Sequence, residues 1–169
     1  MSAFPRQPLH TRLVQQSEDR EADDIPIDVY YGWLFVGSKR ASQNQDAIEK
    51  LKITHIFSLI GPAEHPIPHI TYGHVKIRDE PSQSLGDALV QFLGFVQLAL
   101  LPLNNNVRLL VHCHAGISRS VSMLIAYLMI RYRYKYDEAL AQICKTRPEA
   151  NPNPGFERQL RSIEERINR

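Results

Sequence analysis

Residues 112–120 read His-Cys-His-Ala-Gly-Ile-Ser-Arg-Ser, which puts a thiol six positions before a guanidinium group. A cysteine thiolate is a strong nucleophile, and the planar guanidinium of arginine can hold two oxygens of a phosphoryl group at once. Gly116 allows the backbone between them to curl, so that successive amides converge on an anion. The segment therefore contains the parts of a nucleophile that attacks a bound phosphate ester.

Two predicted elements position this loop. An unperturbed cysteine, with a pKa of about 8.5, is only slightly ionised at neutral pH, so something must lower that pKa. The apolar run 107–111, interrupted only by Arg108, predicts a buried strand, and residues 120–132, which lack Gly and Pro, predict a helix. The free N–H groups and the dipole at a helix N-terminus stabilise a thiolate and a phosphate alike. Cys113 is the predicted nucleophile and Arg119 the predicted phosphate ligand.

The rest of the loop is expected to support these two groups. The Ser120 hydroxyl can donate to the Cys113 sulfur, which is compatible with a capping role in the first helical turn. His112 is expected to hold the loop and to favour the thiolate. A metal site on His112 and His114 is disfavoured, because they flank one cysteine with no second ligand pair at a recognisable spacing. The predicted phosphate-binding lining is His114, Ala115, Gly116, Ile117 and Ser118 together with Arg119.

A leaving phenolate or alkoxide departs more easily when an acid protonates it. Asp79 is the predicted acid, because it follows a strand-like stretch and precedes residues 80–84, a polar segment that predicts a mobile loop over a site. Glu80 is a rival. Asp87 is a second rival, but it fits the first turn of the helix predicted to end at residue 100, where free N–H groups favour an acid.

The loop resembles the signature loop of the cysteine-based protein phosphatases, specifically that of the small dual-specificity phosphatase family. Stretches that also match are 33–38, 53–56, 126–129, 152–156 and Gln159-Leu160, so the resemblance covers about residues 27–165. It implies a two-step reaction without a metal or other cofactor, in which Cys113 attacks phosphorus and water then hydrolyses the phosphocysteine.

The resemblance also implies residue roles. Asp79 fits the position of the family's general acid, and the Ser120 hydroxyl helps the sulfur depart in the second step. Asn153 fits a position that supports the site, although an asparagine between prolines is also common turn chemistry, which the residues themselves favour.

The expected substrate is a phosphorylated protein, a kinase included. The larger tyrosine-specific relatives carry an added N-terminal segment that deepens the pocket, and its absence here implies action on phosphoserine and phosphothreonine as well as phosphotyrosine. The alternatives are a phosphoinositide, RNA 5′-end or glucan phosphatase, and a phosphoprotein-binding pseudoenzyme. Phosphoinositide phosphatases have lysines in this loop that meet the extra phosphates, whereas this chain has His114 and no lysine there. Pseudoenzymes typically lose the cysteine, the arginine or the acid, and candidates for all three are present.

Composition limits the remaining possibilities. A net charge of +2 argues for neither a nucleic acid nor a membrane as partner. The two cysteines cannot form a disulfide if Cys113 is catalytic, so we expect the reducing environment of the cytoplasm and also of the nucleus. Residues 1–24, rich in Gln, Pro and charge, predict a flexible N-terminal arm, and 25–169 form the predicted catalytic domain.

The order of elements predicts the fold. Strands alternate with helices, which predicts an α/β fold with a central, mostly parallel sheet of four to five strands and helices on both faces. The nucleophile loop then lies between a strand and a helix. The predicted strands are 27–37, 53–60, 70–77 and 107–112, and the predicted helices are 44–51, 87–100 and three more from residue 120 onward.

Overall fold

The computed structural model describes residues 24–101 and 106–168, so nearly all of the predicted N-terminal arm lies outside the described residues. The described strands are β1 (Ile27–Tyr30), β2 (Leu34–Gly37), β3 (His55–Ser58), β4 (Thr71–His74) and β5 (Leu109–His112). The described helices are α2 (Lys39–Gln43), α3 (Gln45–Lys50), α4 (Gly86–Leu100), α5 (Arg119–Tyr132), α6 (Tyr136–Cys144) and α7 (Pro154–Ile167).

The strands form one sheet in the order β1-β2-β5-β3-β4. All neighbouring pairs are parallel except β1 with β2, so the predicted mostly parallel sheet is confirmed. β5 occupies the centre, and all four of its residues are buried. The carboxyl ends of β2, β5 and β3 meet at one edge of the sheet, where His112 is in register with Gly37 and Ser58. The loop that follows β5 therefore begins at the middle of this edge.

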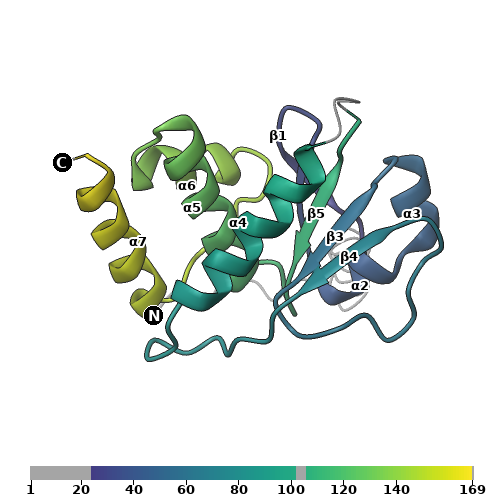
Figure 1. Ribbon diagram of the computed structural model, residues 1–169, viewed down its shortest axis with the longest axis horizontal. Coiled ribbons are helices and arrows are strands. Elements are labelled where there is room, and N and C mark those ends of the chain that lie inside the picture. The colour runs from purple at the N-terminus through teal and green to yellow at the C-terminus, as the bar shows by residue number, and fades with distance from the viewer. Residues whose placement is uncertain (1–23, 102–105, 169) are drawn as a thin grey trace, which may run out of the picture.

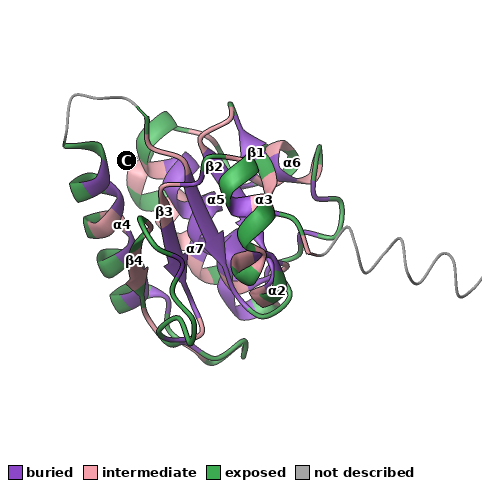
Figure 2. Cartoon of the chain, turned by 90° about the vertical axis from the view of Figure 1, so that its right-hand side faces the viewer, coloured by how far each residue is buried: buried purple, intermediate pink, exposed green. Residues whose placement is uncertain are grey.

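Helices cover both faces of the sheet (Figure 1): α4 to α7 lie on one face, and α2 and α3 lie on the other. The main core lies between the sheet and α4 and α5, and a smaller apolar cluster lies under α3. In Figure 2 the strands in the middle of the sheet are in the colour of buried residues, whereas the outward faces of α3 and α4 are exposed. None of the helices within the described ranges is long and apolar enough to cross a membrane.

The helix that follows the nucleophile loop is the central helix of the fold. Every residue of α5 from Ser120 to Met129 is buried, and α5 packs against α4, α6, α7 and the sheet. A helix that is buried on all sides belongs to the core. Its N-terminus is therefore a fixed position to which a reactive loop can be attached.

The prediction of one strand over residues 27–37 was wrong. A turn separates β1 from β2, because Tyr31 and Gly32 adopt positive φ angles of 47° and 73° and the Asp28 carboxylate accepts hydrogen bonds from the amides of Tyr30 and Gly32 at 3.0 Å. Positive φ is uncommon for tyrosine, so the residue types gave little sign of this turn. The predicted helix 44–51 corresponds to α3. The preceding five-residue α2, capped by Ser38, was not predicted.

Candidate active site

Cys113 directly follows β5 and is only 2% exposed. Its Sγ accepts a hydrogen bond from the Gly116 amide at 3.3 Å and lies 3.3 Å from the Ser120 Oγ. Burial raises the pKa of the Cys113 thiol, but the hydrogen bonds from the Ser120 hydroxyl and from the amides of Ser120, Gly116 and Ile117 lower it more, so the net pKa is below that of an ordinary cysteine. The loop thus stabilises the thiolate despite its burial.

Gly116 has the conformation and the close contact that require a glycine. Its φ is +69°, and an added Cβ would lie 2.7 Å from the carbonyl group of Gly37 at the end of β2. The backbone of the loop therefore crosses the neighbouring strand at a distance that excludes a side chain. The Lys39 amide also donates to the His114 carbonyl at 3.0 Å, which ties the start of α2 to the same loop.

His112 holds the loop as a neutral imidazole. Its side chain is buried, and its Nδ1 lies 3.2 Å from the Cys113 carbonyl oxygen, which can only accept a hydrogen bond, so Nδ1 donates. Burial lowers the pKa of His112 to about 4; the hydrogen bond to Cys113 opposes this shift, and the nearby charge of Lys39 adds to it. At neutral pH His112 therefore carries no positive charge with which to stabilise the thiolate, and what it contributes is the shape of the loop.

Arg119 is the first residue of α5, and its Nη1 donates to the Ile77 carbonyl at 3.2 Å. Its Nε is buried and, among the described residues, has no hydrogen-bond partner. A buried donor without a partner typically costs about 1–3 kcal/mol, more when the group is charged. A phosphoryl oxygen is the kind of acceptor that would satisfy this group, so the side chain fits the predicted role of phosphate ligand.

The lining of the loop is partly open to solvent. Ser118 is the N-cap residue of α5, but its side chain makes no capping hydrogen bond, so it does not occupy the amides of the first turn. His114 and Ala115 are exposed, Ile117 is intermediate, and Gly116 and Ser118 are buried. The exposed His114 side chain therefore lies at the rim of the loop, where it can contact the surroundings of a bound phosphate.

Asp79 lies beside the loop, although it is 34 residues from Cys113 in the sequence. Its Oδ1 accepts hydrogen bonds from the Ser118 hydroxyl at 2.7 Å and from the Asn153 Nδ2 at 2.8 Å. The backbone N–H of Asn153 in turn donates to the Ser118 Oγ at 3.0 Å. Because both donors bind Oδ1, Oδ2 is the carboxylate oxygen left to carry a proton.

Asn153 combines the two roles between which its sequence context left a choice. Its Oδ1 caps α7 by accepting from the amides of Gly155 and Phe156 at 3.0 Å, while its Nδ2 binds Asp79. The rivals of Asp79 are engaged elsewhere: Glu80 lies 3.5 Å from Arg78 in an exposed ion pair, and Asp87 lies in the first turn of α4, as its sequence context predicted.

Arg147 is a supporting residue that sequence reasoning missed. The residue is 5% exposed, and its Nη2 donates to the Ala115 carbonyl at 2.9 Å. Four residues later, the Asn151 amide donates to the Ile117 carbonyl at 2.9 Å. The segment after α6 thus binds the loop at two of its backbone carbonyl groups, those of Ala115 and Ile117. Arg147 is one of 20 lysines and arginines, and nothing in its neighbourhood in the sequence marks it as buried.

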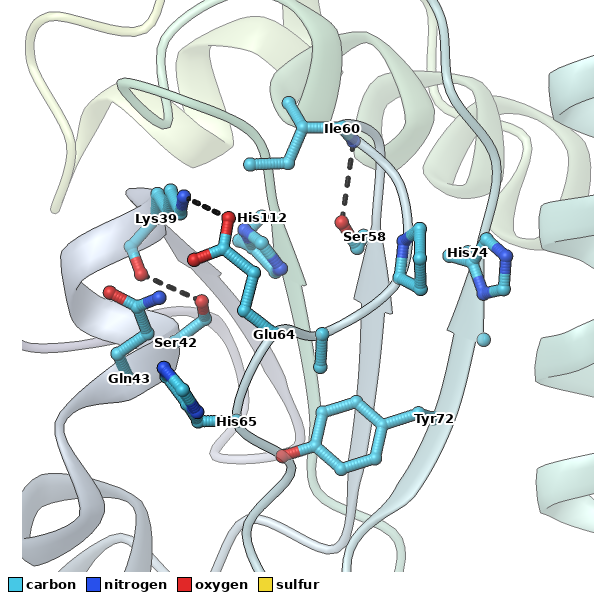
Figure 3. A pocket seen from close by; sticks show the side chains of 13 residues that line it. Lys39, Ser42, Gln43, Ser58, Ile60, Glu64, His65, Tyr72, His74 and His112 are labelled. Carbon is cyan, nitrogen blue, oxygen red and sulfur yellow. Dashed lines mark hydrogen bonds and ion pairs between the residues drawn. The ribbon is translucent and has the colours of Figure 1, made fainter.

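A polar pocket lies beside the loop on the other face of the sheet (Figure 3). His112 lines it together with Ser58 and His74 from the ends of β3 and β4, and an ion pair of 2.7 Å between Lys39 and Glu64 spans it. Successive side chains of a strand point to opposite faces, so Cys113 lies on the other side of β5. Within the described ranges, no three His, Cys, Asp or Glu side chains are arranged to hold a metal ion.

The protein is of the α/β class, with a mostly parallel sheet. A cysteine loop connects its central strand to its central helix, and an aspartate is bound beside that loop. Residues 34–166 match the model of the family described as "Dual specificity phosphatase, catalytic domain", and the chain belongs to this family. This confirms the resemblance noted in the sequence.

Individual relatives agree. The chain is 32% identical over 142 residues to dual specificity protein phosphatase 19 of Mus musculus, covering 83% of this chain but only 63% of that protein. It is 34% identical over 131 residues to dual specificity protein phosphatase 22 of Homo sapiens, covering 78% of this chain and 70% of that protein. The chain thus spans less than two thirds of the length of the mouse relative.

Solved structures share the fold. The crystal structure of DUSP15 superposes with a TM-score of 0.75 at 32% identity, covering 83% of this chain and 88% of that chain. The human tyrosine phosphatase-like serine/threonine/tyrosine-interacting protein superposes with a TM-score of 0.71 at 28% identity, covering 86% of this chain and 99% of that chain.

Proposed function

We propose that this chain is a protein phosphatase that hydrolyses phosphotyrosine and phosphoserine or phosphothreonine through a phosphocysteine on Cys113. The observation that carries the proposal is the Cys113 thiol, because hydrogen bonds at the start of α5 lower its pKa. Arg119, the half-buried first residue of α5, follows it in the same loop. Membership of the dual-specificity family supports the same reaction. The partner is then a phosphorylated protein.

In the first step the Cys113 thiolate attacks phosphorus, and the bond between phosphorus and the leaving oxygen breaks. The amides of residues 114–119 and the Arg119 guanidinium bind the phosphoryl oxygens, as donors aimed at developing charge do in other enzymes. The leaving oxygen takes a proton from Asp79, for which Oδ2 is available because Oδ1 is bound by Ser118 and Asn153.

In the second step water attacks the phosphocysteine and the sulfur–phosphorus bond breaks. The Asp79 carboxylate takes a proton from the water, which restores the acid. The sulfur leaves as a thiolate, and the Ser120 hydroxyl, 3.3 Å away, donates a hydrogen bond to it. Inorganic phosphate is the product, and the protein returns to its starting state.

The substrate class can be tested with three substrates at equal concentration in the presence of a chelator. We expect turnover of a phosphotyrosine peptide and a phosphothreonine peptide, and at least tenfold slower turnover of a soluble phosphoinositide, because the loop has no lysine to meet additional phosphates. Phosphate release is measured for each. Faster turnover of the phosphoinositide would move the substrate class from proteins to lipids.

Ser120→Ala should slow the second step more than the first. The thiolate then leaves without the hydrogen bond from the Ser120 hydroxyl, and loss of one bond to a charged group typically corresponds to a loss of roughly 10- to 100-fold. Phosphocysteine should accumulate, seen as a burst of the aryl alcohol followed by a slow steady state.

Ser122→Ala is the matched control, since Ser122 is equally buried in α5 and its hydroxyl binds the Ser118 carbonyl at 2.7 Å rather than the sulfur. A burst in both variants, or in neither, would argue against the role of Ser120.

The second candidate function, a phosphoprotein-binding pseudoenzyme, is raised by the phosphatase-like interacting protein among the structural relatives. This chain retains Cys113, Arg119 and Asp79, which favours catalysis. Comparison of the wild type with a variant that lacks the thiol separates the two functions.

A further inference from the structure

We infer that Gln159, on α7, is a positioning residue for the general acid, because it fixes the loop that carries Asp79. The inference rests on the role of Asp79 proposed above. Residues 78–85, named here the acid loop, lead from the end of the sheet to α4, and the sequence predicted a mobile loop over residues 80–84. In the structure Asp79 is bound from the starts of α5 and α7, and Gln83 and Leu85 are bound by Gln159 of α7.

The Gln159 amide group binds the C-terminal end of the acid loop. Its Oε1 accepts from the Leu85 amide at 2.8 Å, and its Nε2 donates to the Gln83 carbonyl at 2.9 Å and to the Gly155 carbonyl at 3.2 Å. The Leu85 side chain is buried in the main core. The Gln159 side chain therefore connects Gln83 and Leu85 of the acid loop to the first turn of α7.

The N-terminal end of the acid loop is bound to the catalytic machinery itself. Arg119 donates to the carbonyl of Ile77, the residue that precedes the loop, and Asn153, the N-cap of α7, donates to Asp79. Within the loop, the Gln83 side chain accepts from the Arg78 amide at 3.2 Å. The loop between these points is short, so a displacement of its C-terminal end is transmitted to Asp79.

The first turn of α7 also packs directly against the acid loop. An added Cβ at Gly155 would overlap the carbonyl group of Pro81, so the two backbones are in contact with no space for a side chain. Gly155 thus fixes the acid loop at Pro81, and Gln159 fixes it at Gln83 and Leu85. The position of the Asp79 carboxylate is thus set by Gly155 and Gln159 of α7, as well as by its direct partners Ser118 and Asn153.

The experiment combines Gln159→Leu with Asp79→Asn and measures the hydrolysis of aryl phosphates with a good and a poor leaving group. A displacement of about 1 Å can cost roughly 100-fold in rate, so we expect a loss of about 10- to 100-fold in kcat for phenyl phosphate. The loss should be much smaller for a good leaving group, which needs no proton. Gln159→Leu should add no further loss in the Asp79→Asn background.

Gln142→Leu is the matched control. Gln142 also lies on a helix and donates to a backbone carbonyl, that of Val29, at 3.1 Å, but it does not contact the acid loop. Its kcat should equal that of the wild type. Gln159→Glu is the second variant if Gln159→Leu does not fold: it keeps the acceptor for Leu85 and loses the donor for Gln83, so a smaller loss with the same dependence on leaving group is expected.

Two results would overturn the inference while leaving the acid role of Asp79 intact: an equal loss with both leaving groups, or a full additional loss when Gln159→Leu is combined with Asp79→Asn. Either would mean that Gln159 acts on general stability rather than through the acid. If Asp79→Asn alone has no effect, the acid role itself fails, and the positioning role fails with it.

Discussion

Cys113→Ser is expected to abolish turnover of every phosphate ester while phosphate binding persists. The serine hydroxyl is far less acidic than the thiol, so the hydrogen bonds at the start of α5 that ionise Cys113 cannot ionise its replacement. Loss of a nucleophile in other hydrolases lowers kcat by on the order of a million-fold. Phosphate release measures the first property, and calorimetric titration with a phosphotyrosine peptide measures the second.

Cys144→Ser is the control for Cys113, because Cys144 is a half-buried thiol of α6 whose Sγ lies 3.8 Å from the Ala150 carbonyl. Its activity should equal that of the wild type. If the wild type and Cys113→Ser are equally inactive but bind the peptide equally well, the chain is a binding protein and not an enzyme.

The lowered pKa of Cys113 also predicts the acid side of the pH profile. The reactive form is the thiolate, which is present above the pKa and lost as the pH falls through it, so kcat/KM should fall on the acid side. Because the pKa is lowered, this fall should occur at a lower pH than for an ordinary cysteine. The rate of alkylation by iodoacetamide should fall over the same range.

Asp79→Asn is expected to lower kcat by roughly 100- to 10,000-fold for phenyl phosphate, the range typical of the loss of a general acid. The asparagine can keep contact with Ser118 and Asn153, but its amide is not acidic enough to protonate a leaving group. The loss should be much smaller for a good leaving group, which needs no proton. Steady-state kinetics with good and poor leaving groups tests both expectations.

Glu80→Gln and Asp87→Asn are the controls for Asp79, because both remove a carboxylate near it in sequence. Glu80 lies in an exposed ion pair and Asp87 in the first turn of α4, so neither change should affect the dependence on leaving group. A loss confined to poor leaving groups that appears in Glu80→Gln but not in Asp79→Asn would reassign the acid to Glu80.

The nucleophile loop could be predicted because all its parts are contiguous. Cys113, Gly116 and Arg119 lie within seven residues, between a buried strand and a buried helix whose patterns are strong. The mostly parallel sheet could be predicted for a related reason, since alternating strands and helices leave few ways to connect them. The sequence thus contained the fold class and the position of the proposed nucleophile within it.

Contacts between distant segments could not be predicted. Arg147 binds the loop from 32 residues away, and Gln159 binds the acid loop from 74 and 76 residues away. Such contacts depend on where the chain returns after α6, which no local pattern encodes. The lowered pKa of His112 could not be read from the sequence either, because it depends on a burial that only the assembled sheet provides.

The proposed nucleophile depends on one helix, whereas the proposed acid depends on two. The Cys113 loop leads into α5, which is buried almost throughout. Asp79 is bound by Ser118, the N-cap of α5, and by Asn153, the N-cap of α7, and α7 buries only Gly155, Phe156 and Leu160. Segments with fewer buried contacts open at lower free energy than the core. Local opening of α7 would therefore free Asp79 from Asn153 while the Cys113 thiolate persisted. Such a molecule would lose activity towards phosphate esters with poor leaving groups yet stay sensitive to alkylation and oxidation.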